Sequence, residues 1–139
     1  MGEKAVIFGL LFWFISSFPA ASELSRAKEL YYCGRIADSY RILVEMENSG
    51  YGLEAGAFFA SVLSELGEYA RANKILLNLD PIANKSIIGV VFLKNLLRWK
   101  RFDLARMYLK ELETDDRFFF EVKGDILFYT GDFRGAIKA

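Results

Sequence analysis

The chain has 139 residues, of which 53% are hydrophobic and 26% charged, a balance that suits one folded domain and excludes a disordered segment. Its 18 basic residues equal its 18 acidic residues, so it lacks the basic excess that marks a nucleic-acid-binding protein. It contains no histidine, the commonest general base and metal ligand, and its single cysteine excludes an internal disulfide or a multi-cysteine zinc site.

Residues 1–22 differ in composition from the rest of the chain. A short charged start, Met1–Lys4, precedes a run without charge from Ala5 to Phe18, and small residues follow at Ala20 and Ser22. This order is typical of a secretory signal peptide that is cut after Ser22. Two alternatives stay open. The segment can be retained as a membrane anchor, although it is short for a span of about 20 residues, or it can form a first packing helix.

From residue 23 onward, the same residue types recur at a nearly constant interval around four turn positions. These positions are Gly34, Gly67, Lys100 and Gly131, which lie 33, 33 and 31 residues apart. Leucine stands four residues before each of them, a large apolar residue stands two residues after, and a small residue stands five residues after. A period of this length predicts an array of helical repeats.

Each repeat is expected to form two amphipathic helices around its turn. The expected units are residues 23–49, 53–81, 86–113 and 117–139, separated by loops rich in helix-breaking residues. Glycine can adopt the left-handed backbone that ends a helix, whereas Lys100 either adopts it at a cost of about 1–2 kcal/mol or changes the turn. Small side chains are expected at the closest helix contacts, at Ala27, Ala60, Gly124, Ala72, Ala105 and Ala136.

Cys33 stands just before the turn glycine of the first unit. It is predicted to be a small buried hydrophobe, because no basic cluster or histidine accompanies it to favour a reactive thiol.

Three consecutive phenylalanines, Phe118–Phe120, open the last unit. They cannot all face one side of a helix, so at least one is predicted to pack on the neighbouring unit and another to be exposed at a contact surface.

The repeat is most complete in residues 57–81 and 124–139. Each of these stretches contains a glycine–acidic–aromatic turn, Gly67-Glu68-Tyr69 and Gly131-Asp132-Phe133, with alanine three residues after the aromatic. These residues resemble the tetratricopeptide repeat (TPR) family, including its secreted and periplasmic members, and Asp80-Pro81 resembles the end-of-repeat signal of that family. The other units depart from the pattern at Ile36, Ser39 and Lys100.

The resemblance implies an all-α fold, in which tandem antiparallel helix hairpins form an α–α superhelix of about four units, the last one incomplete. First helices in this family line a concave groove that commonly binds peptides or partner proteins. The chain is therefore expected to be a non-enzymatic protein–protein interaction scaffold outside the cytoplasm, either periplasmic or secreted. The alternative is a membrane-anchored TPR subunit that organises an envelope, secretion or enzyme complex.

In such an array, side chains three and six positions before each turn should face the groove. They are Lys28 and Tyr31, Ser61 and Ser64, Lys94 and Leu97, Asp125 and Phe128, with Tyr32 and Arg98 close by. Aromatic ends and a basic middle predict an extended peptide with an acidic or carboxylate group as ligand; ordinary solvated or packed side chains are the alternative. The sequence predicts no catalytic residue, cofactor, metal site or nucleic-acid partner, because it contains no nucleophile elbow and no phosphate loop.

The last unit stops at Ala139, seven residues after Asp132 and within its expected second helix. A repeat array requires a terminal helix with a polar outer face. The native protein is therefore expected to continue or to have this end covered by a partner, and self-association through the open end is also expected. An enzyme whose chemistry lies beyond these residues is a further hypothesis, which no motif supports.

Overall fold

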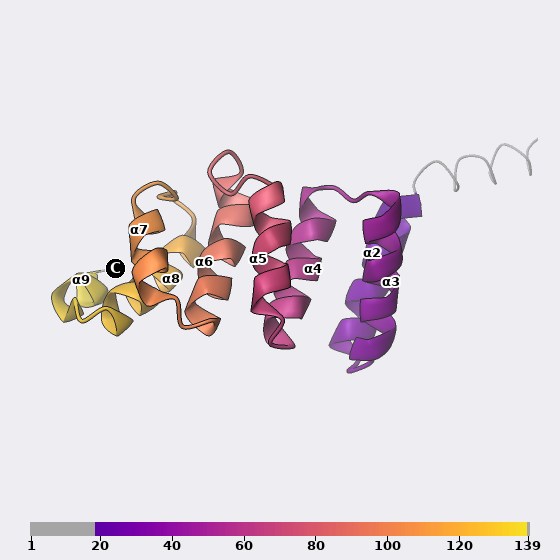
Figure 1. The fold of residues 1–139 in the computed structure, drawn as a ribbon, viewed down its shortest axis with the longest axis horizontal. Coiled ribbons are helices and arrows are strands. Elements are labelled where there is room, and N and C mark those ends of the chain that lie inside the picture. The colour runs from indigo at the N-terminus through magenta and orange to yellow at the C-terminus, as the bar shows by residue number, and fades with distance from the viewer. Residues whose placement is uncertain (1–18, 139) are drawn as a thin grey trace, which may run out of the picture. The chain divides into compact units, whose positions relative to one another are not determined.

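The computed structural model of the protein describes residues 19–138, and every regular element in this part of the chain is helical (Figure 1). The α-helices are α2 (Pro19–Tyr32), α3 (Ile36–Ser49), α4 (Leu53–Glu65), α5 (Tyr69–Asn78), α6 (Val90–Arg98), α7 (Phe102–Leu109), α8 (Arg117–Tyr129) and α9 (Phe133–Lys138). A π-helical turn, η1 (Lys85–Gly89), leads into α6. The all-α class expected from the sequence is confirmed.

The chain divides into two compact units between Tyr51 and Gly52. The first unit contains α2 and α3, which pack against each other. The second unit contains α4 to α9, and each of these helices contacts the next one along the chain. In addition, α4 contacts α6 and α6 contacts α8, so the alternate helices α4, α6 and α8 are neighbours.

Four turns of one backbone geometry join the paired helices α2–α3, α4–α5, α6–α7 and α8–α9. Gly34, Gly67, Lys100 and Gly131 occupy the left-handed region in these turns, with φ of 83°, 85°, 60° and 87°. In the α4–α5 turn, the N–H of Gly67 donates to the carbonyl of Ser64 (3.1 Å), and the next N–H reaches the carbonyl of Leu63 (2.9 Å). The matching N–H groups make the same two bonds in the other three turns. These bonds satisfy carbonyls that the end of the first helix would otherwise leave open.

Lys100 therefore adopts the left-handed conformation that the glycines adopt in the other three turns. A non-glycine residue in this region costs about 1–2 kcal/mol, whereas a glycine adds about 0.4–1 kcal/mol of conformational entropy to the unfolded chain. We expect Lys100→Gly to raise the free energy of unfolding by about 0.5–1 kcal/mol, because the relieved backbone strain exceeds the added entropy. Urea denaturation followed by circular dichroism measures the difference.

The control for this change is Gly67→Lys, which places lysine in a turn of the same geometry. A Cβ atom at Gly67 would meet nothing within 4 Å, so the effect of the substitution comes from the backbone and not from a clash. Gly67→Lys should lower the free energy of unfolding by a similar amount. An unchanged stability of both variants would show that the turn tolerates any residue.

Small residues lie at the helix contacts of both units, as predicted. Four of them are fully buried: Ala27, Ala60, Ala72 and Ala105. In the last helix pair, Gly124 and Ala136 are only partly buried. Ser39 takes the place of the alanine in the first pair and is also buried, and its hydroxyl donates to the backbone carbonyl of Ala27 (2.6 Å). This bond gives the buried hydroxyl the partner that it requires.

The predictions for residues 1–18 lie outside the described part of the chain. Helix α2 already begins at Pro19, so the candidate cleavage site after Ser22 falls within this helix. Proline suits the first turn of a helix, because its missing N–H would have no partner inside the helix there. Among the described helices, none has the length and apolar character needed to cross a membrane.

Cys33 is exposed, so the prediction that it is a small buried hydrophobe is wrong. It lies in the turn after α2, where its N–H donates to the carbonyl of Glu29 (2.9 Å). The turn residues from Cys33 to Arg35 are all exposed, because the chain has left the buried stripe of α2 at this point.

Candidate partner-binding surface

The predicted groove residues of the second unit lie on the three neighbouring helices α4, α6 and α8. Those that solvent reaches form what we call the first-helix surface: Ser61, Lys94, Leu97, Arg98, Asp125 and Phe128. Ser61 and Leu97 are partly buried, and the other four are exposed. Two contacts join side chains of adjacent helices on this side of the unit: one between Arg98 and Glu65, the other between Lys94 and Phe118.

The basic middle of this surface is weaker than predicted, because Arg98 is partly neutralised. Its Nη2 atom lies 3.8 Å from Oε1 of Glu65, and both side chains are nearly half exposed. An exposed pair of this kind contributes about 0–1 kcal/mol, so a ligand carboxylate can displace it at small cost.

Lys94 is the cation of this surface that is best placed to meet a ligand. Its Nζ atom lies 5.5 Å from the ring centroid of Phe118, within the range of a cation–π contact. In the part of the chain that the structure describes, Lys94 forms no ion pair, so its charge can pair with a carboxylate of a partner.

An aromatic group forms the α8 end of the surface, as the sequence predicts. The Phe128 ring is 55% exposed and lies edge-on to Tyr129 (5.6 Å between centroids) and to Phe133 of α9 (5.5 Å). Tyr129 in turn stacks on Phe102 of α7 at 5.0 Å. These neighbours hold the Phe128 ring, so a ligand gains an apolar contact there with little loss of side-chain freedom.

The remaining predicted residues do not join this surface. Lys28 and Tyr31 belong to α2 of the first unit, where both are partly buried. Tyr32 is exposed, and its ring lies edge-on to that of Tyr31 at 5.5 Å.

Ser64 was predicted to face the groove, but it is buried and its hydroxyl has no hydrogen-bond partner among the described residues. Helix α6 packs on α4, and a short side chain such as serine is easily covered by a neighbouring helix. Ser64 therefore offers no surface to a partner.

Sequence reasoning missed Glu65 and Tyr129, which stand two positions before their turns. The same register had selected Tyr32 and Arg98, so applying it to all four units would have found both. It had no signal for the pairing of Glu65 with Arg98, because that pairing depends on the contact between α4 and α6.

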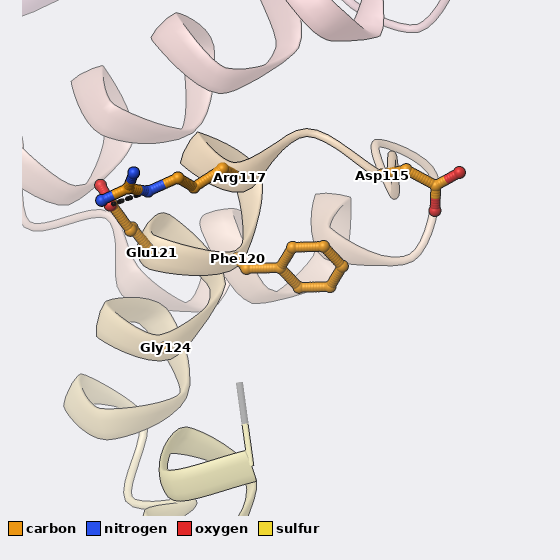
Figure 2. Close-up of a pocket in the computed structure, with 5 residues that line it drawn as sticks. All are labelled: Asp115, Arg117, Phe120, Glu121 and Gly124. Carbon is orange, nitrogen blue, oxygen red and sulfur yellow. Dashed lines mark ion pairs between the residues drawn. The ribbon is translucent and has the colours of Figure 1, made fainter.

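The start of α8 borders a shallow hollow of about 570 Å³ (Figure 2). Its lining residues are Asp115, Arg117, Phe120, Glu121 and Gly124. The Arg117 Nε atom lies 3.5 Å from Oε1 of Glu121, and Figure 2 shows this pair and the Phe120 ring projecting from α8. Within the run of three phenylalanines, Phe119 is buried while Phe118 and Phe120 are exposed, as predicted.

The chemistry that this surface offers is charge pairing, ring stacking and apolar contact. Within the described residues, no group of three or more His, Cys, Asp or Glu side chains could hold a metal ion. No protein-family model, curated protein or solved structure matches the chain. Its function is therefore inferred from its own surfaces.

Proposed function

We propose that the chain is a TPR-like helical solenoid that acts as a non-enzymatic protein–protein interaction scaffold. One observation supports this most: α4, α6 and α8 are neighbours and together expose Lys94, Arg98 and Phe128. The four turns of equal geometry support the repeat arrangement, since each ends the first helix of a pair in the same way. Repeat arrays commonly use such side-by-side helices as extended binding surfaces.

The ligand proposed for the first-helix surface is an extended peptide or a segment of a partner protein. Its acidic group would pair with Lys94 and Arg98, and an apolar side chain would pack on Phe128. A charge-assisted hydrogen bond contributes about 1.5–3 kcal/mol, more than the existing Arg98–Glu65 pair, so the exchange of partners is favourable.

The double variant Lys94→Ala, Arg98→Ala is expected to bind an acidic peptide at least about tenfold more weakly than the parent chain, because both cations are lost. The probe is a fluorescein-labelled peptide selected from a random-peptide library on the parent chain, and fluorescence anisotropy measures its dissociation constant. Binding should also weaken as salt concentration rises.

The matched control is Lys74→Ala, Lys110→Ala, which removes two exposed lysines from α5 and from the residue that follows α7. It changes the net charge of the chain by the same amount and should leave peptide binding within about twofold of the parent. Equal losses in the two double variants would reduce the effect to overall charge and overturn the assignment of the surface.

We further propose that the scaffold works outside the cytoplasm, with residues 1–22 as a cleaved signal. N-terminal sequencing of the mature protein tests this, since a start near Glu23 supports secretion. A retained N-terminus would favour the alternative, a membrane-anchored subunit that organises a larger complex. The uncharged run from Ala5 to Phe18 is the feature that both versions rest on.

A further inference from the structure

One side of the last helix pair exposes an apolar surface that we call the α8–α9 face. Its members are Phe120, Gly124, Phe128, Phe133, Ala136 and Ile137. A hollow of about 370 Å³ lies between α8 and α9, and Gly124 lines both this hollow and the one near the start of α8. The two hollows therefore adjoin along α8.

The matching positions in the two preceding helix pairs are covered. Gly56 and Gly89, which correspond to Phe120, are both buried. Ala72 and Ala105 are fully buried, whereas Ala136 is only partly buried. The cover in each case is a helix: α6 contacts both α4 and α5, and α8 contacts both α6 and α7. The repeat geometry thus shows what kind of element fits this face.

Large apolar side chains stand on the α8–α9 face where the preceding pairs have smaller or polar ones. Phe120 replaces two glycines and is 38% exposed. Ile137 stands where the other pairs have Asn73 and Arg106, and it is 87% exposed. Burying one such side chain contributes about 1.5–3 kcal/mol, so covering this face favours binding.

Helix α8 illustrates the stripe that such a covering helix carries. Its buried side chains, Phe119, Val122 and Ile126, follow the spacing i, i+3, i+7 along one face of the helix. This spacing is also that of amphipathic helices that bind in apolar grooves of other proteins.

The charges along the two hollows select the flanks of the occupant. Three carboxylates line them, at Asp115, Glu121 and Asp125, against one guanidinium, that of Arg117, which already pairs with Glu121. We propose that the α8–α9 face binds an amphipathic helix of a partner protein, with an apolar stripe at i, i+3, i+7 and basic residues beside it. A second copy fits less well, because it would set the same carboxylates against each other.

This inference goes beyond the peptide site on the first-helix surface, with which it shares only Phe128. The probe is a fluorescein-labelled peptide of roughly 18 residues, about five helical turns. It carries the Phe–Val–Ile stripe of α8 with lysine flanks. One control peptide has the same composition with the stripe permuted, and another has glutamate flanks. We expect both controls to bind the full chain at least about tenfold more weakly than the probe.

Ile137→Asp should weaken binding of the lysine-flanked peptide about tenfold or more, because it places a charge in the apolar contact. The matched control is Met107→Asp, which changes an exposed apolar residue of α7 and should leave the affinity unchanged. Lys94→Ala, Arg98→Ala should leave it unchanged too, which separates this face from the first-helix surface. Circular dichroism checks that each variant keeps its helices.

Equal affinity of the parent and Ile137→Asp for the probe would overturn the proposal. So would binding that ignores the permuted stripe. Light scattering gives the third outcome: a dimer of the parent chain that Ile137→Asp dissociates would assign the face to a second copy and also overturn it.

Discussion

Replacing Phe92 with alanine is expected to lower the free energy of unfolding by about 3–5 kcal/mol. Phe92 is 1% exposed and belongs to α6, which contacts α4, α5, α7 and α8. Its ring lies edge-on to Tyr108 of α7, with 5.0 Å between centroids. Truncation removes this aromatic contact, which contributes about 0.5–1.5 kcal/mol, and leaves a cavity that the surrounding helices fill only in part.

Urea denaturation monitored by circular dichroism measures this loss, with the transition midpoint and slope compared between variants. The matched control is Phe118→Ala, which removes the same side chain where it is 56% exposed on α8. Its effect should stay within about 0.5 kcal/mol, as for most surface substitutions. A similar loss in the two variants would contradict the central place of α6 in the second unit.

The helix pairs were predictable because their signals are local. A leucine four residues before each turn, a large apolar residue after it and a small residue beyond fix the buried stripe of each pair. The turn at Lys100 shows how strongly this pattern acts. The flanking residues match those of the glycine turns, and the lysine backbone takes the same left-handed conformation.

Element ends were less predictable, because they depend on single bonds and on packing. Asn48 and Ser49 resemble a loop in sequence, yet α3 continues through Ser49 and stops only at Gly50, where φ is 88°. The Ser49 hydroxyl bonds back to two carbonyls of its own helix, at 3.3 Å each. The π-helical turn before α6 has no local signal, and it ends at Gly89, where an added Cβ would lie 3.4 Å from Leu112 Cδ2 and the carbonyl of Pro81.

The candidate surface was predictable in position but not in its partners. Register along the chain selects Lys94 and Arg98, whereas the ion pair of Arg98 with Glu65 arises from packing between helices. Asn95 illustrates the same limit inside the core. It is buried where the neighbouring pairs carry apolar residues, and its Nδ2 donates to the carbonyl of Tyr69 on α5 (3.0 Å). A contact between residues 26 positions apart leaves no mark on the local sequence.

Replacing Ala72 with leucine is the second large expected effect, a loss of about 1–3 kcal/mol in the free energy of unfolding. Ala72 lies on α5 and is fully buried at the helix contacts of the second unit. A leucine there adds three carbon atoms where neighbouring helices are already in contact, so it forces side chains from their preferred rotamers or separates the helices.

Ala70→Leu is the matched control, because Ala70 belongs to the same helix and is exposed. Leucine is nearly as good a helix former as alanine, so this control should change stability by less than about 0.5 kcal/mol. Thermal unfolding by circular dichroism should therefore separate the two variants by several degrees. Equal unfolding temperatures for Ala72→Leu and Ala70→Leu would mean that the small residues five positions after the turns are not required for close helix packing. Ala105→Leu in α7 repeats the test in the next helix pair, where the alanine is equally buried.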